Sequence, residues 1–300
     1  MKIKYNIAPL WWIHKMAFLT LIISLFISCD KIAEPYLIAT GTIDTVACPA
    51  PIFPAISNHI KRVLLEDYTG HTCVNCPSAA LSAHNLKEQY ADKLVVIAVH
   101  AGYFAKPSNT GNYTYDFRTP AGTDWDNYFG IGAIGNPNGM VNRRKINNTY
   151  VIAPSGWSGA VAGMVSETPL IDIHIINEYS SEGRKLCTHV QTQFLQAIDK
   201  NLKLIVALTE DSIVAPQKNN DPLVGITPDI LNYVHMHALR GTITSTWGTS
   251  VADDGTSAVV NSYKYLLNAA IKSKNCTVVA FVYDTDTYEV LQAAEAKVIN

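Results

Sequence analysis

The sequence predicts an α/β domain followed by an all-β domain built as an antiparallel sandwich. A strand–loop–helix–strand pattern over residues 61–100 demands a parallel strand pair with a right-handed crossover. After residue 168 apolar and polar residues alternate in several short segments separated by polar turns, which is typical of half-buried strands. A chain of 300 residues suits two domains of ordinary size. We expect a signal peptide at residues 1–28, a lipidated tether at 29–57, the α/β domain at 58–167 and the β-sandwich at 168–300.

The N-terminal segment is typical of an export signal. Met16–Ile27 is an uncharged apolar run that follows three lysines and is too short for a comfortable membrane span. Ser28-Cys29 resembles the bacterial lipobox, in which the cysteine is lipidated and becomes the mature N-terminus, although Phe26 replaces the usual aliphatic residue. An ordinary signal peptide or an N-terminal anchor is the alternative. In the tether we expect one short strand at Tyr36–Thr40.

Composition excludes several classes of protein. Hydrophobic residues make up 48% and charged residues 16%, which excludes bulk disorder, and the net charge of −2 is unlike that of a nucleic-acid binder. Without residues 1–28 the chain keeps 20 of its 23 basic residues and all 25 acidic ones. A Gly-rich phosphate loop, a Ser-His-Asp order and a paired-carboxylate site are all missing from the sequence, so we expect no cofactor.

The α/β domain begins with a short apolar stretch and alternates strands with helices. A polar insertion at 101–122 interrupts it, and a helix at Ser155–Val165 closes it. Between the two we expect a helix at Asp124–Phe129 and a strand at Met140–Arg143. The elements expected before the insertion are a strand at Lys61–Tyr68, a helix at Pro77–Tyr90 and a strand at Lys93–His100.

The loop before the first helix carries the motif with the clearest chemistry, Cys73-Val74-Asn75-Cys76. A thiol at a helix N-terminus faces unpaired backbone N–H groups and the positive end of the helix dipole, which favour the thiolate. A second thiol one turn later lies close enough to resolve a mixed disulfide. The motif therefore indicates redox-capable geometry, with Cys73 as the attacking thiolate and Cys76 as the resolving thiol.

Two other interpretations of the cysteine pair stay open. In an exported protein the pair could be a purely structural disulfide. It could also bind zinc or copper together with His71 and His84, but no second Cys-x-x-Cys provides further soft ligands, so we expect no metal.

Residues 62–100 resemble the active-site region of the thioredoxin superfamily. Residues 67–77 (DYTGHTCVNCP), 136–143 (NPNGMVNR) and 233–240 (YVHMHALR) are similar to the Bacteroidetes outer-membrane lipoprotein family named after a twenty-eight-kilodalton outer membrane protein. This resemblance implies a thioredoxin-like domain at 58–167 and localisation at the outer membrane, on its periplasmic or cell-surface face. It also implies a cis-proline facing the cysteine pair, for which Pro137 is the candidate. Thr72 replaces the usual tryptophan before the first cysteine, and the insertion lengthens the spacing to Pro137.

The β-domain offers a second cysteine pair and a histidine pair. We expect strands at Leu170–Ile176, Lys185–Phe194, Leu202–Thr209, Tyr233–Ser245 and Thr277–Tyr283. Cys187 and Cys276 fall in or beside these strands and could form a structural disulfide, or stay as two buried thiols. Cys48 would then be the odd thiol of the tether. His235 and His237 alternate on one strand, so they should share a face, either as polar surface or, with a third ligand, as a metal site.

The sequence thus leads to two functional hypotheses. The first is a membrane-anchored thiol–disulfide exchange protein that uses Cys73, Cys76 and Pro137 on a protein substrate. The second is a non-enzymatic cell-surface binding or adhesion lipoprotein in which the same cysteines are a structural disulfide. Nucleic acid is not an expected partner of either.

Overall fold

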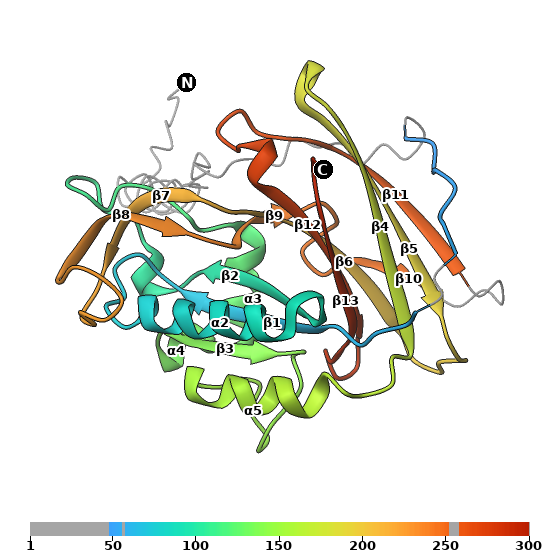
Figure 1. Cartoon of the computed structure of the whole chain (residues 1–300), viewed down its shortest axis with the longest axis horizontal. Coiled ribbons are helices and arrows are strands. Elements are labelled where there is room, and N and C mark those ends of the chain that lie inside the picture. Colours follow the sequence, from blue (N-terminus) through green and yellow to red (C-terminus); the bar gives the residue numbers. More distant parts are fainter. Residues whose placement is uncertain (1–47, 56–57, 252–257, 300) are drawn as a thin grey trace, which may run out of the picture. The chain divides into compact units, whose positions relative to one another are not determined.

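A mixed eight-stranded sheet organises the protein (Figure 1). The computed structural model describes residues 48–55, 58–251 and 258–299. The expected signal peptide, the lipidation candidate Cys29 and the short strand expected at Tyr36–Thr40 lie outside the described residues. None of the helices in the described ranges has the length and apolar character needed to cross a membrane.

The predicted strand–helix–strand unit is confirmed. Strand β1 (Val63–Thr69) leads into helix α2 (Cys76–Tyr90), and β2 (Leu94–His100) pairs with β1 in parallel, from Val63 opposite Leu94 to Thr69 opposite His100. Both strands are buried almost throughout because helices cover both of their faces.

The next elements follow the expected order with shifted ends. Helix α3 (Pro120–Phe129) starts four residues earlier than expected, because Thr119 caps it by accepting a hydrogen bond from the Gly122 backbone N–H and Pro120 fits its first turn. Strand β3 (Asn138–Val141) also starts earlier and ends before Asn142, where the chain enters positive φ. The short helix α4 (Ile131–Ile134) precedes β3, and α5 (Pro154–Met164) follows it.

Beyond residue 168 the described chain is built of strands joined by loops and short 3₁₀ turns. Five expected strands are present, but the Tyr233–Ser245 segment is the end of one strand and the whole of the next, because His237 has a φ of 54° and breaks the run. The strands are β4 (Ile171–Ser180), β5 (Lys185–Phe194), β6 (Leu202–Glu210), β7 (Ile213–Lys218), β8 (Asp229–His235), β9 (Ala238–Thr242), β10 (Thr249–Val251), β11 (Ala258–Leu266), β12 (Cys276–Asp284) and β13 (Val290–Lys297).

The large sheet runs across the boundary expected at residue 168. Its order is β13-β12-β6-β9-β2-β1-β3, with β10 paired to β6. Strand β9 makes the connection: Ala238 pairs in parallel with Ala98 of β2 and antiparallel with Glu210 of β6. Residues before and after position 168 therefore contribute strands to one sheet.

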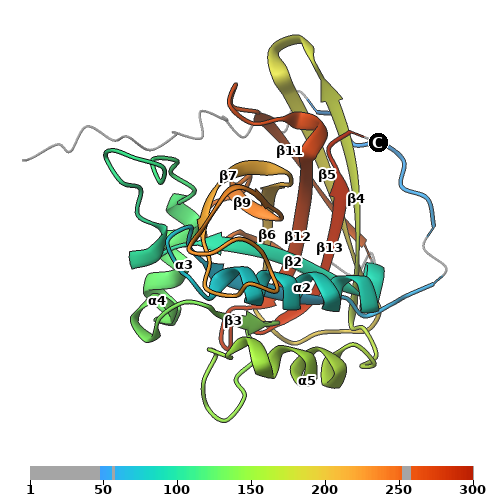
Figure 2. The ribbon, with the colours of Figure 1, turned by 60° about the vertical axis from the view of Figure 1, so that its left-hand side comes forward.

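Three apolar cores cover the two faces of this sheet. On one face, α2 and α5 pack over β1–β3, and the three-stranded antiparallel sheet β11-β5-β4 packs over β6, β12 and β13. Helix α3 packs on the opposite face against β1, β2, β6 and β12. Figure 2 shows β4 and β5 lying across β12 and β13. The described C-terminal part is therefore rich in strands, as the sequence predicts, but one of its two packed sheets is the mixed sheet rather than a purely antiparallel one.

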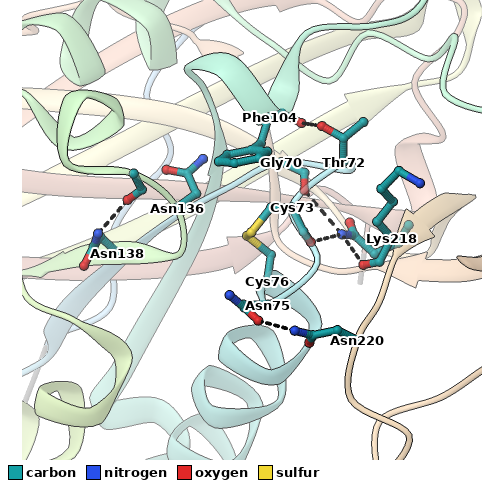
Figure 3. Close-up of a disulfide and its surroundings, with 12 residues drawn as sticks. Gly70, Thr72, Cys73, Asn75, Cys76, Phe104, Asn136, Asn138, Lys218 and Asn220 are labelled. Carbon is teal, nitrogen blue, oxygen red and sulfur yellow. Dashed lines mark hydrogen bonds between the residues drawn. A yellow bond between two sulfur atoms is a disulfide. The ribbon is translucent and has the colours of Figure 1, made fainter. Parts of the chain in front are cut away.

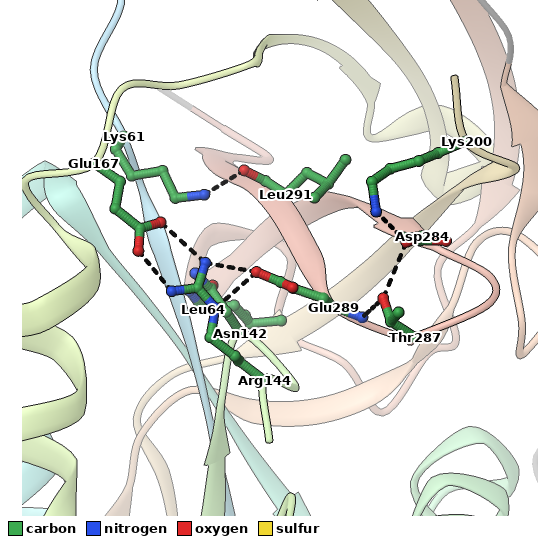
Figure 4. A network of polar contacts seen from close by, with 10 residues as sticks. All are labelled: Lys61, Leu64, Asn142, Arg144, Glu167, Lys200, Asp284, Thr287, Glu289 and Leu291. Carbon is green, nitrogen blue, oxygen red and sulfur yellow. Dashed lines mark hydrogen bonds and ion pairs between the residues drawn. The ribbon is translucent and has the colours of Figure 1, made fainter. Parts of the chain in front are cut away.

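A polar network ties the loops at one end of the sheet together (Figure 4). Arg144, which follows β3, donates from Nη1 and Nη2 to the Glu167 carboxylate at 2.5 and 3.0 Å, and from Nε to Glu289 at 2.7 Å. Burial lowers the pKa of the nearby Lys61 ammonium, which donates to the Leu291 carbonyl at 2.5 Å. Charged side chains therefore link the loops after β3, α5 and β12.

The second disulfide differs from the expected one. Cys187 pairs with Cys48, with Cα atoms 5.7 Å apart, and the buried Cys276 is the free thiol among the described cysteines. The expected Cys187–Cys276 bridge and the free Cys48 were therefore wrong. Cys276 begins β12 in the large sheet, opposite Glu210, whereas Cys187 lies in the three-stranded sheet. Segment 48–55 runs beside that second sheet, and the Phe53 ring meets His174 of β4 at 5.4 Å.

Candidate functional site

The Cys73–Cys76 pair lies where β1 ends and α2 begins, as the sequence predicts. The two cysteines form a disulfide, with Cα atoms 5.4 Å apart, and Cys76 is the first residue of the helix. The first turn of α2 contains no acidic side chain, and Asn75 at its N-cap makes no side-chain capping bond. The backbone N–H of Cys76 donates to the Cys73 carbonyl at 3.4 Å and that of Ala79 to the Asn75 carbonyl at 3.4 Å, so it is mainly the positive end of the helix dipole that can stabilise negative charge on a sulfur.

Pro137 lies at the same end of the sheet. The Asn136–Pro137 peptide bond is cis, as the resemblance led us to expect. Strand β3 starts directly afterwards, with Asn138 opposite Tyr68 of β1, so the proline loop and the cysteine loop both lie at the C-terminal end of β1. Figure 3 shows Asn136 on one side of the disulfide, with Lys218 and Asn220 on the other.

The polar insertion covers part of the cysteine loop. Thr72 donates to the Phe104 carbonyl oxygen from both its backbone N–H, at 3.1 Å, and its hydroxyl, at 2.8 Å (Figure 3). The contact requires Gly70, because a Cβ at that position would lie 2.4 Å from the Phe104 backbone. The insertion therefore holds the loop by backbone contacts.

A hairpin from the C-terminal part holds the cysteine loop from the other side. We call β7, β8 and the loop between them, residues 213–235, the clasp hairpin. The Gln217 side-chain amide donates to the Cys73 carbonyl at 2.9 Å and the Gly70 carbonyl at 3.3 Å. The Lys218 N–H donates to the His71 carbonyl at 2.9 Å, and the Asn220 N–H to the Val74 carbonyl at 3.1 Å. In this closed arrangement Cys73 is 2% exposed and Cys76 is 1% exposed.

The insertion and the clasp hairpin also contact each other. The Tyr113 hydroxyl donates to the Asp229 carboxylate, and the Lys218 ammonium lies 3.1 Å from the same carboxylate and over the Tyr113 ring. Asp221 of the clasp hairpin accepts a hydrogen bond from the Ser78 hydroxyl at 2.9 Å, which brings a carboxylate to the first turn of α2. The insertion and the clasp hairpin, neither of which belongs to the strand–helix–strand unit, therefore enclose the disulfide.

Asp67 is a site residue that sequence reasoning missed. It lies in β1, is 2% exposed, and its Oδ1 has no hydrogen-bond partner among the described residues. Burial raises the pKa of its carboxyl to about 7. Asp67 and Cys76 line the same cavity of about 300 Å³ beneath α2. The available signal was an acidic pair, Glu66-Asp67, inside an otherwise apolar strand.

Three buried histidines lie next to this cavity. Rings of His100 and His235 each meet Phe117 of the insertion at 4.4 Å, and the His71 ring meets it at 5.9 Å. Burial lowers the pKa of all three, that of His235 to about 3, so the imidazoles are neutral at physiological pH. His237, which we expected on one strand with His235, lies past the end of β8 and pairs with Asp211 at 3.2 Å, although both histidines line the cavity.

The residues considered as metal ligands have other surroundings in the structure. The part of the chain that the structure describes contains no cluster of three or more His, Cys, Asp or Glu side chains arranged to hold a metal ion. His84, the second proposed ligand beside the cysteines, lies on the exposed side of α2 and pairs with Glu88 at 3.3 Å.

Fold and site together define a mixed α/β protein with a disulfide-bonded Cys-x-x-Cys pair at a helix N-terminus. The family model for the outer membrane protein Omp28 matches residues 124–300. The chain therefore belongs to the Omp28 family of outer membrane proteins, as its resemblance indicated.

Solved structures resemble the chain at low sequence identity. HBP35 of Porphyromonas gingivalis has a TM-score of 0.58 at 16% identity, over 80% of this chain and 76% of that one. A structural-genomics protein from Agrobacterium tumefaciens has a TM-score of 0.51 at 11% identity, over 81% and 96%. A domain of the outer membrane lipoprotein Omp28 from P. gingivalis covers 43% of this chain and 88% of its own, at 22% identity and a TM-score of 0.31. Among curated proteins none matches.

Proposed function

We propose that this Omp28-family protein is a lipid-anchored thiol–disulfide exchange protein whose thioredoxin-like unit spans residues 58–167. The observation that carries the proposal is the position of one disulfide: Cys76 opens α2, Cys73 lies in the preceding loop, and the buried carboxyl of Asp67 lines the cavity behind Cys76.

The strand connections support a thioredoxin-like unit. Strand β1 lies between a parallel neighbour, β2, which follows the helix, and an antiparallel neighbour, β3, which follows the cis-proline. Helices α2 and α5 share one face of these strands, and α3 covers the other. A Gly139–Ile152 bridge adds a short antiparallel contact before α5.

The proposed reaction is a two-step exchange. In the reduced protein the Cys73 thiolate attacks a substrate disulfide, forming a Cys73–substrate S–S bond and releasing one substrate thiolate. The Cys76 thiol then gives its proton to Asp67 and attacks the Cys73 sulfur, forming the Cys73–Cys76 bond and releasing the second substrate thiolate. Two electrons pass from protein to substrate, and the two substrate thiolates take up protons. The reverse sequence oxidises a substrate dithiol.

Access to the disulfide is the main structural demand of this proposal. A substrate sulfur cannot reach Cys73 while the clasp hairpin and Phe104 hold the loop, so we infer that the clasp hairpin moves away before exchange. Pro137 would then present backbone polar groups to the substrate beside Cys73.

The reduction potential of the Cys73–Cys76 couple tests the proposal. We expect a value between about −270 and −120 mV, the range of exchange proteins, measured by alkylation and mass analysis in glutathione buffers. The Cys48–Cys187 disulfide of the same molecules serves as an internal control and should stay oxidised. A Cys76→Ser variant should trap a mixed disulfide on Cys73. A couple below about −300 mV that traps nothing would refute exchange.

The burial of both sulfurs favours a second candidate, a non-enzymatic cell-surface binding lipoprotein with a structural Cys73–Cys76 disulfide. In that case a Cys73→Ser/Cys76→Ser variant should lose stability or partner binding while the cell shows no redox phenotype. The redox-exchange proposal instead requires that the variant folds and that envelope substrates accumulate in the wrong oxidation state.

We also propose lipidation at Cys29, which would anchor the mature chain to the outer membrane. Family membership and the apolar run before Cys29 support this proposal. Metabolic labelling with an alkyne fatty acid should mark the wild-type protein and a Cys276→Ser control. A Cys29→Ser variant that is still labelled and membrane-bound would refute it.

A further inference from the structure

The cavity beneath α2 has features of a ligand site that thiol exchange does not need. Its volume of about 300 Å³ is at the lower end of the range for small-molecule pockets, and α2, β2 and the clasp hairpin all contribute to it. Most of its lining is apolar, including Pro77, Leu81, Val96 and Val224. Three of the lining apolar side chains are partly exposed, namely Leu81 (43%), Val234 (47%) and Met236 (43%), which is the expected arrangement around an opening to solvent.

The same cavity contains buried polar atoms that lack partners. Asp67 Oδ1, His235 Nε2 and both ring nitrogens of His100 have no hydrogen-bond partner among the described residues, although each of the three side chains is at least 96% buried. An unpaired buried polar group costs roughly 1–3 kcal/mol. A ligand that offers hydrogen bonds here would recover part of that cost.

The charge of the lining restricts the chemistry of such a ligand. The residues lining the cavity include neither lysine nor arginine, and burial keeps the imidazoles of His100 and His235 neutral. The other two lining histidines, His84 and His237, already face the carboxylates of Glu88, at 3.3 Å, and Asp211, at 3.2 Å, so an anion would find no unpaired cation here. Below about pH 7 the Asp67 carboxyl is largely protonated and can donate a hydrogen bond. An uncharged oxygen, hydroxyl or carbonyl, can pair with a neutral imidazole and a carboxyl at once.

The aromatic and imidazole rings that line the cavity favour a ligand with an aromatic ring. The imidazoles of His100 and His235 lie 5.5 Å apart between centroids, and the Tyr233 ring meets His235 edge-on at 4.8 Å. A flat ring can pack against such faces and edges. We propose that this cavity binds a small, uncharged aromatic molecule that carries a hydroxyl or carbonyl oxygen, with the ring among the apolar side chains and the oxygen at Asp67, His100 and His235.

Three matched probes test the proposal on the oxidised protein: p-cresol, toluene and p-toluate. Calorimetry and saturation-transfer NMR should show saturable p-cresol binding at least tenfold tighter than toluene binding, and no saturable p-toluate binding. Absence of p-cresol binding, or tighter binding of toluene or p-toluate, would overturn the proposal.

Substitutions inside the cavity and away from it test where p-cresol binds. Ala98→Phe places a ring in the cavity and should weaken p-cresol binding at least tenfold, whereas Ala162→Phe on the exposed side of α5 should leave it unchanged. Leu81→Trp narrows the opening at a partly exposed position and should weaken binding even if Ala98→Phe fails to fold. His235→Phe should reduce p-cresol affinity to that of toluene. Undiminished p-cresol binding in both Ala98→Phe and Leu81→Trp would place the ligand elsewhere and refute the site.

Discussion

At the scale of single residues, two adjacent buried carboxyls of β1 differ in their surroundings and in their charge. Glu66 is fully buried and accepts two hydrogen bonds from Arg143, at 2.8 and 2.7 Å. The adjacent Asp67 points to the other face of the strand and pairs with no cation among the described residues, so burial raises its pKa to about 7. Of these two acidic neighbours, Glu66 thus forms a structural ion pair, and Asp67 is a titratable group of the site.

The raised pKa of Asp67 predicts a pH dependence of stability. Between about pH 4, where an unfolded aspartate titrates, and pH 7 the folded state binds the extra proton, so this group makes the free energy of unfolding fall as pH rises. The loss is at most roughly 4 kcal/mol for a pKa that rises from about 4 to about 7. Asp67→Asn should flatten the decline in urea unfolding measured from pH 4 to 8.

The matched control for this experiment is Asp124→Asn, the same change at an exposed position of α3. It should retain the wild-type pH profile. If Asp67→Asn also retains it, the pKa of Asp67 is not raised in the folded protein, and its carboxylate is too weak a base to take the Cys76 proton at neutral pH.

The Glu66–Arg143 pair gives the second prediction at this scale. The Arg143 guanidinium lies among the rings of Trp125, Phe129 and Phe281, at 4.8–5.2 Å from their centroids. Glu66→Gln leaves this cation buried without a countercharge, so we expect a loss of about 3–5 kcal/mol in denaturant unfolding. The double variant Glu66→Leu/Arg143→Met should be less destabilised than Glu66→Gln. Equal losses of unfolding free energy in the two variants would show that the unpaired charge of Arg143 is not the cause of the destabilisation.

At the scale of elements, the clasp hairpin covers one side of the cysteine loop. Its Gln217 amide reaches three carbonyls, those of Gly70, Cys73 and Lys218. The segment contacts the cysteine loop through side-chain and backbone hydrogen bonds at its tip, whereas its own strands pair with each other in a two-stranded sheet. A two-stranded sheet has marginal stability of its own, so these contacts hold it in place.

Removing the Gln217 amide should therefore loosen the clasp hairpin. Gln217→Ala removes the amide that donates to the Gly70 and Cys73 carbonyls and leaves the Cys73 carbonyl only the 3.4 Å hydrogen bond from the Cys76 N–H, at a cost of roughly 1 kcal/mol to the closed arrangement. We expect reduction of Cys73–Cys76 by dithiothreitol to be about tenfold faster, followed by alkylation and mass analysis. Gln191→Ala, the same change on β5, should not alter the rate. An unchanged rate in Gln217→Ala would mean that reduction does not require the clasp hairpin to open.

At the scale of the whole molecule, the Cys48–Cys187 disulfide fastens the segment before β1 to the three-stranded sheet. It joins residues 139 positions apart, so it closes a loop that contains the cysteine site and β1–β3. In the chain-entropy model a loop of this length restricts the unfolded state strongly, although strain and residual structure lower the net gain.

Loss of this bridge should destabilise the fold without changing the site. We expect Cys48→Ser/Cys187→Ser to lose about 2–4 kcal/mol of unfolding free energy in urea and to keep the wild-type Cys73–Cys76 potential. Cys276→Ser serves as the comparison, since its thiol donates only to the Lys272 carbonyl, at 3.4 Å. A potential that changes in the double variant would mean that the N-terminal segment reaches the site.

Much of the local structure was predictable from the sequence because local patterns cause it. The strand–helix–strand unit, the helix beginning at the cysteine pair and the strands after residue 168 follow from periodicity, a proline in the first helical turn and β-branched runs. The strand break depends on the positive φ of His237, and the early start of α3 depends on the cap from Thr119. The spacing of apolar residues does not indicate either feature.

The sequence by itself determined which thiols could do chemistry, because the spacing of Cys73 and Cys76 and the helix that follows are local features. Tertiary structure alone decided what surrounds them. It joined Cys48 to Cys187, ran one sheet through both sequence textures and brought Asp67, His235 and Gln217 to the two cysteines. The physical reason is that, apart from Asp67 on the strand before the cysteines, these partners lie far apart along the chain: Cys48 and Cys187 are 139 positions apart and Gln217 is 144 positions from Cys73. Only long-range strand pairing and core packing bring them together.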